Sequence, residues 1–150
     1  MTVEKGAGET ASISDEAYEE AGASIATAAK AVAGADIVLG VQAPDVAALK
    51  GATKGAWVAA TFDPFGNKDR IDAYAKGGFE ALSMEFMPRI TRAQSMDVLS
   101  SQSNLAGYKA VISAGNEYGR AFPMMMTAAG TVQAARAFVM GVGVAGLQAI

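Results

Sequence analysis

A glycine-rich turn near the end of the chain has the spacing of a dinucleotide-binding motif. Gly141-Val-Gly-Val-Ala-Gly146 follows the apolar run Ala137–Met140. In such a motif the first glycine permits a tight turn, the second lets the backbone approach a pyrophosphate, and the third lets a helix pack closely on a strand. The motif alone is a weak signal, because ordinary strand–helix turns can also be rich in glycine. The residues that we expect to bind a dinucleotide phosphate are Gly141, Val142, Gly143, Val144 and Gly146.

A second set of polar side chains lies on a short loop that runs into a predicted helix. Its members are Arg89, Gln94, Asp97 and Ser100. Structural roles also fit this spacing, because Thr91 and Gln94 match a capping box and Asp97 can cap the next helix. Arg89 can pair with Asp97 or with Glu85 at the surface. Residue types and spacing therefore leave open whether this loop binds a ligand.

The composition excludes several kinds of site. The 150 residues include no cysteine and no histidine, so we expect no disulfide, no thiol nucleophile, no histidine base and no metal site. Lysine and arginine number 12 against 15 acidic residues, which argues against a nucleic-acid interface. Polar residues and glycines interrupt the apolar stretch 121–150, so we expect no transmembrane segment. The N-terminus also lacks the pattern of a secretory signal.

Short β-like runs alternate with helical stretches, which predicts an α/β fold with a parallel sheet. The expected strands cover residues 37–41, 57–62, 79–84 and 136–140. The expected helices cover residues 24–33, 69–76 and 98–118, with a helical turn at 47–50 and another helix that begins after Ser14. Val98, Leu105, Tyr108 and Ile112 are expected to form the apolar face of the longest helix. We also expect Trp57 to lie in the core.

Three segments of the chain resemble a known family, the alpha subunit of proton-translocating NAD(P) transhydrogenase, in its NAD(H)-binding domain. The first and most extensive segment is Met84-Glu-Phe-Met-Pro-Arg-Ile-Thr-Arg-Ala-Gln-Ser-Met-Asp-Val-Leu-Ser-Ser-Gln-Ser-Asn-Leu-Ala-Gly-Tyr108. The others are Arg120-Ala-Phe-Pro-Met-Met-Met-Thr-Ala-Ala-Gly-Thr-Val132 and the glycine turn itself. The resemblance extends from about Val3 to Ile150 and favours a ligand-binding role for the polar loop.

The resemblance implies a Rossmann-like or flavodoxin-like parallel sheet with flanking helices, a long connecting helix and the start of a second, Rossmann NAD-binding domain. We expect residues 1–96 to form an incomplete N-terminal α/β domain, residues 97–130 a connecting helix and loop, and residues 131–150 the start of the Rossmann domain. The family has a strand–helix–strand unit before the glycine turn seen here as Lys5–Gly8, and a βαβ unit needs about 30 residues. We therefore expect the chain to be truncated at both ends.

The resemblance also implies roles for the polar loop. Arg89 would approach the nicotinamide end of NAD(H), and Asp97 with Ser100 would lie at the nicotinamide ribose. Gln94 would face a neighbouring domain that binds NADP(H). Hydride transfer needs no general base, but it does need two rings held face to face with water excluded. Arg89, Gln94 and Asp97 are therefore the expected catalytic residues.

As a whole, the resemblance implies an oxidoreductase that exchanges hydride between NAD(H) and NADP(H), with proton translocation coupled to it by partner domains. The expected partners are the beta subunit with its NADP(H)-binding domain and a transmembrane domain, together with a second copy in a homodimer. The expected location is the cytoplasmic face of the inner membrane, where those partners hold the chain peripherally.

Some positions depart from the family pattern and keep other functions open. Gly40 and Ala43 stand where the family carries lysine and arginine, and Thr131-Val-Gln-Ala134 replaces a proline-rich stretch. An alanine dehydrogenase is the less favoured alternative, because that enzyme binds its keto acid with an arginine, a lysine and a histidine. A second alternative is a non-catalytic fragment of the transhydrogenase subunit, and we expect these 150 residues alone to be inactive.

Overall fold

The computed structural model describes all residues from Met1 to Ile150. It divides into two compact units, Met1–Met87 and Pro88–Ile150. The first unit is α/β with parallel sheets, as the alternation of strand-like and helical runs predicts. None of the helices in either unit combines the length and the apolar character needed to cross a membrane.

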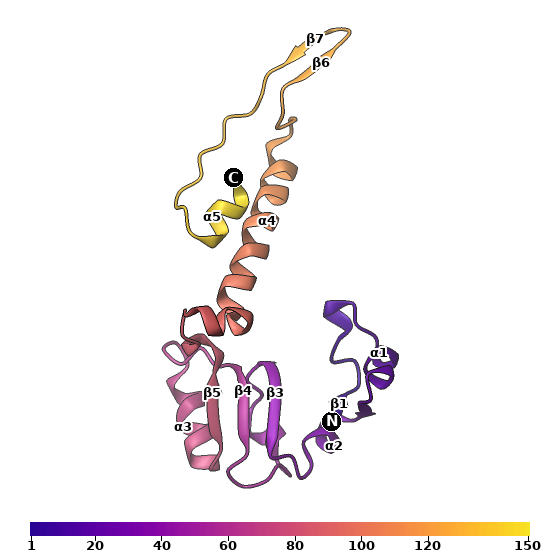
Figure 1. Ribbon diagram of the computed structural model, residues 1–150, viewed down its shortest axis with the longest axis vertical. Coiled ribbons are helices and arrows are strands. Elements are labelled where there is room, and N and C mark those ends of the chain that lie inside the picture. Colours follow the sequence, from indigo (N-terminus) through magenta and orange to yellow (C-terminus); the bar gives the residue numbers. More distant parts are fainter. The chain divides into compact units, whose positions relative to one another are not determined.

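The first unit contains two small parallel sheets (Figure 1). Its strands are β1 (Thr2–Glu4), β2 (Ser24–Ala26), β3 (Ile37–Gln42), β4 (Trp57–Thr61) and β5 (Glu80–Ser83). One sheet pairs β1 with β2, and the other has the order β3-β4-β5. The three strands of the larger sheet confirm the expected strands at 37–41, 57–62 and 79–84 to within a residue at each end.

Helices connect these strands and cover one face of the larger sheet. The helical elements are the 3₁₀ turn η1 (Glu9–Ala11), α1 (Asp15–Glu20), α2 (Ala28–Val32), η2 (Val46–Leu49), α3 (Lys68–Gly77) and η3 (Met84–Phe86). The Ser14 side chain accepts a hydrogen bond from the Ala17 N–H and so begins α1, as expected. The predicted helix at 69–76 and the predicted helical turn at 47–50 correspond to α3 and η2.

The core of the first unit lies between the larger sheet, η2 and α3. Val58 and Ala60 of β4 are fully buried, as are Phe62 and Tyr74 or nearly so. The rings of Phe62 and Tyr74 meet edge to face at 5.0 Å. The Tyr74 hydroxyl donates to the carbonyl of Pro44 at 2.6 Å, and burial raises the pKa of this phenol. This cluster fixes the side of the sheet on which the helices pack.

The opposite face of the larger sheet is exposed. Ile37 pairs with Trp57 and Leu39 with Ala59, so these residues share one face of the pleat. Ile37 is 59% exposed, Leu39 70% and Trp57 54%. The expectation that Trp57 lies in the core is therefore wrong. Its strand is buried on one side only, and alternation of side chains places Val58, rather than Trp57, on the covered side.

The predicted helix over residues 24–33 is also wrong at its beginning. Residues Ser24–Ala26 form β2, which pairs in parallel with β1, and α2 begins only after Thr27. The alanine-rich composition of this stretch favours a helix locally. Hydrogen bonds to β1 override that preference, because pairing between segments far apart in sequence is absent from a local pattern.

The second unit contains the 3₁₀ helix η4 (Thr91–Met96), α4 (Val98–Tyr118), a hairpin of β6 (Met125–Thr127) and β7 (Gly130–Val132), and α5 (Val144–Ala149). The helix α4 has the predicted bounds. The hairpin was not predicted. The strand expected at 136–140 is absent, because residues 133–142 are irregular and no neighbouring strand pairs with them. An extended segment without a paired neighbour has no ladder of hydrogen bonds to make it a strand.

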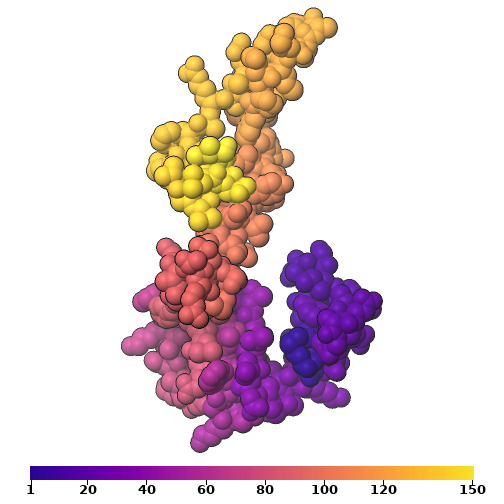
Figure 2. Space-filling view, in the orientation of Figure 1, coloured from indigo at the N-terminus to yellow at the C-terminus, as the bar shows by residue number.

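The face of α4 that packs is not the predicted apolar one. Leu105, Tyr108 and Ile112 are all about half exposed, whereas Gly107 is the buried residue of this helix. The helix α5 lies against α4 (Figures 1 and 2). Small side chains permit this close contact, so the position of α5 depends on where α4 lacks bulk rather than on where it is most apolar.

Candidate functional site

The polar loop begins at Pro88 and continues through η4 to Asp97. Ile90 occupies the cap position of η4, and no side chain caps it. The capping box suggested by Thr91 and Gln94 is therefore wrong. Gln94 contributes only its backbone carbonyl, which accepts a hydrogen bond from the Asp97 N–H at 3.3 Å. Its side chain is exposed and is therefore free to contact another molecule.

Asp97 holds the beginning of α4. One carboxylate oxygen, Oδ1, accepts from the Ser100 N–H at 3.1 Å, and the other, Oδ2, accepts from the Ser100 hydroxyl at 2.6 Å. The hydrogen bond from the Ser100 side chain, followed by that from its backbone, lowers the pKa of Asp97, and Arg89 adds a weak Coulombic contribution. The capping role considered for Asp97 is confirmed. The carboxylate stays ionised, and each of its oxygens retains a lone pair for another donor.

The pairing considered between Arg89 and Glu85 has a competitor. Both carboxylate oxygens of Glu85 are already engaged, one by the Asp63 N–H at 2.7 Å and the other by the Ser83 hydroxyl at 2.6 Å. Desolvation raises the pKa of Glu85, but these hydrogen bonds together outweigh it and leave the pKa lowered. Glu85 thus serves the loop after β4, and the Arg89 side chain is exposed.

The three glycines of the turn each have a separate structural reason. Gly141 has a φ of 98°, a conformation that side chains with a Cβ rarely adopt. A Cβ on Gly146 would overlap the carbonyl oxygen of Gly141 and lie 2.9 Å from its carbonyl carbon. Gly143 precedes the first turn of α5, and a Cβ there would meet only open space. The middle glycine therefore leaves its backbone open to an approaching ligand, while the outer two shape the turn.

The polar loop and the glycine turn line one cavity of about 450 Å³ within the second unit. Arg89 and Ser100 line it together with Gly141, Gly143 and Gly146. Its remaining lining residues are Leu99, Ser103, Met140, Val144 and Ala145. The structure thus brings together two segments that are about 40 residues apart in sequence, and the volume lies in the range of ordinary small-molecule sites.

The cavity does not include every residue expected at the site. Gln94, Asp97 and Val142 do not line it, although Asp97 holds Ser100, which does. Ser103 lines the cavity but was not among the expected site residues. Its position three residues after Ser100 on α4 places both on one helix face, and this spacing is the signal that could have identified it.

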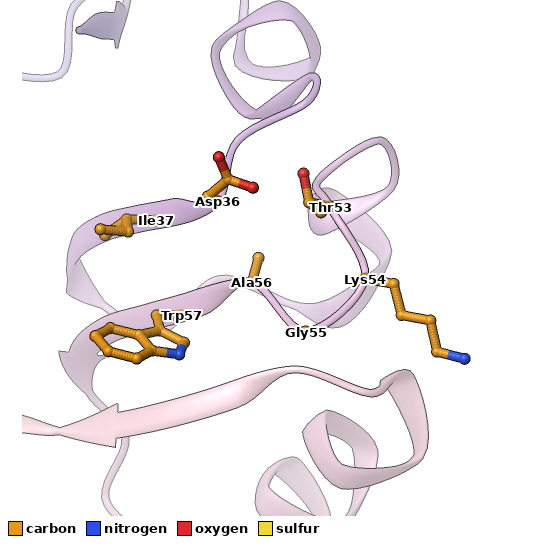
Figure 3. Close-up of a pocket in the computed structure, with 7 residues that line it drawn as sticks. All are labelled: Asp36, Ile37, Thr53, Lys54, Gly55, Ala56 and Trp57. Carbon is orange, nitrogen blue, oxygen red and sulfur yellow. The ribbon is translucent and has the colours of Figure 1, made fainter.

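A smaller hollow of about 260 Å³ lies in the first unit (Figure 3). Its lining residues are Asp36, Ile37, Thr53, Lys54, Gly55, Ala56 and Trp57. These residues lie where β3 and β4 begin, whereas ligands of parallel α/β sheets bind where the strands end. The Lys54 side chain extends away from Asp36 and Thr53 (Figure 3). This hollow contains none of the expected site residues.

The two substitutions noted in the first unit are structurally accommodated. Gly40 lies within β3, where a Cβ would be 3.1 Å from the Gln42 carbonyl oxygen. Ala43 is buried in the core, and its N–H donates to the Thr61 carbonyl at 2.9 Å. Neither residue lines the cavity of the second unit. These departures therefore leave the residues of that cavity unchanged.

Comparison with protein families gives matches along nearly the whole chain. The family model described as alanine dehydrogenase/PNT, N-terminal domain, matches residues 1–106. The model described as alanine dehydrogenase/PNT, C-terminal domain, matches residues 110–150. The boundary between the two matches falls within α4, so this helix is shared by the two family domains.

Individual relatives and a solved structure agree with these matches. An NAD(P) transhydrogenase subunit alpha of Rhodospirillum rubrum is 55% identical over 159 residues, which cover 100% of this chain and 41% of the relative. The corresponding subunit of Rickettsia prowazekii (strain Madrid E) is 49% identical over 155 residues, with coverage of 100% and 40%. The crystal structure of transhydrogenase from Sinorhizobium meliloti superimposes with a TM-score of 0.93 at 59% identity, over 99% of this chain and 44% of that one. The chain thus spans about two fifths of the length of these relatives.

Proposed function

The chain belongs to the alanine dehydrogenase/PNT family, and we propose that its residues form part of the NAD(H)-binding side of an NAD(P) transhydrogenase alpha subunit. The relatives named above carry transhydrogenase names, which favours this activity over that of an alanine dehydrogenase. The chain also has no histidine with which to bind a keto acid in the manner of that enzyme.

One observation carries the proposal: Arg89 and Ser100 line the same cavity as the glycine turn. A dinucleotide needs a backbone that its pyrophosphate can approach closely, and Gly143 leaves such an open backbone. It also needs polar groups beyond the pyrophosphate to orient the nicotinamide end, and Arg89 is the one charged residue of the cavity. The side chains present therefore fit NAD(H).

Each residue has a proposed role in binding. The backbone of Gly141, Val142, Gly143, Val144 and Gly146 receives the pyrophosphate. Arg89 contacts the nicotinamide end, and Ser100 contacts the nicotinamide ribose. Asp97 keeps the Ser100 hydroxyl in place through the 2.6 Å hydrogen bond and can accept a second bond from the ribose. NAD(H) supplies the hydride chemistry, so the residues of this chain act by binding and orientation.

Gln94 has a different role in the proposal. Its side chain is exposed and does not line the cavity, so it can reach across to a neighbouring domain that holds NADP(H). Hydride transfer requires the two nicotinamide rings to lie face to face at close range. A neutral amide suits such a contact, because it can donate and accept hydrogen bonds without adding charge near the rings.

The remaining elements of the proposal concern the larger assembly. A beta subunit would supply the NADP(H)-binding domain and the transmembrane domain that couples hydride transfer to proton movement. The chain would act in a homodimer at the cytoplasmic face of the membrane, where its partners hold it. These expectations rest on the names of the relatives and on the resemblance of Met84–Tyr108 to the family.

Calorimetric titration of NADH tests the cofactor site directly. We expect saturable binding to the chain and a loss of affinity of about tenfold in Arg89→Ala, because hydrogen bonds to charged groups contribute about 1.5–3 kcal/mol. Arg92→Ala is the matched control. Arg92 lies in the same loop and carries the same charge, but it does not line the cavity. Equal affinity of the two variants, or no saturable binding by the unaltered chain, would contradict the proposal.

A further inference from the structure

Gly107 is the point of closest approach between α4 and α5. It is the buried residue of α4. A Cβ built on Gly107 would overlap the carbonyl oxygen of Ala145 and lie 3.0 Å and 3.1 Å from the carbonyl carbon and Cα of that residue. All three of these atoms belong to the backbone, so no side-chain rotation could relieve the overlap. Any larger residue at position 107 must therefore move α5 relative to α4.

This contact bears on the cavity, because the two helices form opposite walls of it. Ser100 and Ser103 line the cavity from α4, on the helix face that also contains Gly107. Ala145, whose backbone touches Gly107, lines the cavity from α5 together with Gly146. The separation of the helices at Gly107 therefore sets the distance between the Ser100 side and the glycine-turn side of the cavity.

The helix α5 cannot hold this position by itself. It has six residues, from Val144 to Ala149, and isolated helices of that length are not stable in water. Leu147, its largest side chain, is 63% exposed. Packing of its backbone against α4 is therefore the main constraint on α5, and the glycine turn that leads into it depends on the same contact.

We propose that Gly107 is a positioning residue for the cofactor site, because it lets α5 bring the glycine turn to binding distance of Ser100 and Arg89. This inference rests on the proposed function. A glycine inside a long helix weakens that helix, so its presence there suggests a packing reason. Gly115 of the same helix lacks such a reason, since a Cβ there would meet only the Phe122 ring, at 3.8 Å and 3.9 Å.

The comparison of Gly107→Ala with Gly115→Ala tests the proposal, because both changes raise the helix propensity of α4 by the same amount. We expect Gly107→Ala to weaken NADH binding by about tenfold or more, as overpacking displaces α5. Gly115→Ala should change the affinity by less than about twofold, because it adds only ordinary contacts. Far-UV circular dichroism should show undiminished helix content in both variants.

The fluorescence of bound NADH separates positioning from mere stability. At saturating NADH, a variant that is only less stable would give the emission of the unaltered complex. A displaced turn places the nicotinamide ring in a different environment, so Gly107→Ala should show a changed emission at saturation. Unchanged affinity and emission in Gly107→Ala would overturn the inference.

Hydrogen exchange gives a second test that needs no cofactor. The N–H groups of Leu147 and Ile150 donate to Gly143 and Gly146 within α5. We expect these amides to exchange faster in Gly107→Ala than in Gly115→Ala, while the amides of α4 keep their protection. If the unaltered chain fails to bind NADH, the proposed cofactor site is wrong, yet this comparison still decides whether Gly107 positions α5. Equal exchange in both variants would overturn that role.

Discussion

Asp97 combines two tasks that are usually given to different residues. It caps the longest helix through the Ser100 N–H, and it fixes the hydroxyl of the same serine at the edge of the cavity. A capping residue is held by backbone geometry, so its second oxygen also has a defined place. The proposed binding group Ser100 is thereby oriented by the same carboxylate that begins α4.

The titration of Asp97 leads to a prediction at this scale. Its pKa in the folded chain lies below the ordinary value of 3.8, first because of the Ser100 hydroxyl. A group with a lowered folded pKa stabilises the fold above its unfolded pKa, and this stabilisation is lost as the pH falls through the folded pKa. We therefore expect the cap to be intact at pH 5 and lost below about pH 3.

An NMR titration that follows the Asp97 carboxyl carbon and the Ser100 amide would check this expectation. The Ser100→Ala variant is the control, because it removes the hydroxyl donor and keeps the backbone donor. Its Asp97 should titrate at a higher pH than in the unaltered chain. A midpoint at or above the ordinary aspartate value in the unaltered chain would be the contrary result.

At the scale of elements, the glycine turn and α5 distinguish shape from access. Gly146 is needed for the turn itself, since a side chain there would overlap the Gly141 carbonyl. Gly143 has a φ of −75° and open space around its Cβ position, so alanine fits it without strain. The two positions lie within one motif but have different physical reasons for glycine.

These reasons predict different outcomes for two alanine variants. Gly143→Ala should keep the hydrogen-exchange protection of α5 but weaken NADH binding by about tenfold, because its methyl group blocks the approach of the pyrophosphate. Gly146→Ala should lose both, because the turn must shift. Calorimetry and hydrogen exchange on the two variants measure each effect separately. Tight NADH binding by Gly143→Ala would show that the pyrophosphate does not lie on this backbone.

At the scale of the whole molecule, the chain forms two units whose surfaces differ in kind. The first unit covers one face of its larger sheet and leaves Ile37, Leu39, Val41 and Trp57 exposed on the other. Parallel sheets are normally covered on both faces. The second unit contains the candidate cavity. The expected domain boundaries at residues 96 and 130 stay predictions.

The exposed sheet face predicts self-association of the chain in water, because contiguous apolar surface favours contact with other molecules. Leu39→Glu should reduce that association, since it places a charge in the middle of the face. Ala29→Glu is the control, because Ala29 is exposed on α2 and the charge change is the same. Sedimentation velocity over a range of concentrations would measure both variants. Equal association in the two would exclude this face as the cause.

The sequence alone determined the features whose signals are local. The bounds of α4, the Asp97 cap and the three strands of the larger sheet follow from periodicity, capping residues and short apolar runs. The glycine spacing and the polar loop were likewise visible as motifs. Their predicted roles in binding NAD(H) remain to be tested by the titrations above.

Only the tertiary structure decided which of these features meet. It paired Ser24–Ala26 with β1 against the local preference for helix, and it placed Trp57 on the exposed side of its sheet. It also brought Arg89 to the same cavity as the glycine turn, with Gly107 setting the approach of α5. The physical reason is that such contacts join residues distant in sequence, where packing and backbone pairing outweigh the preferences of each segment taken alone.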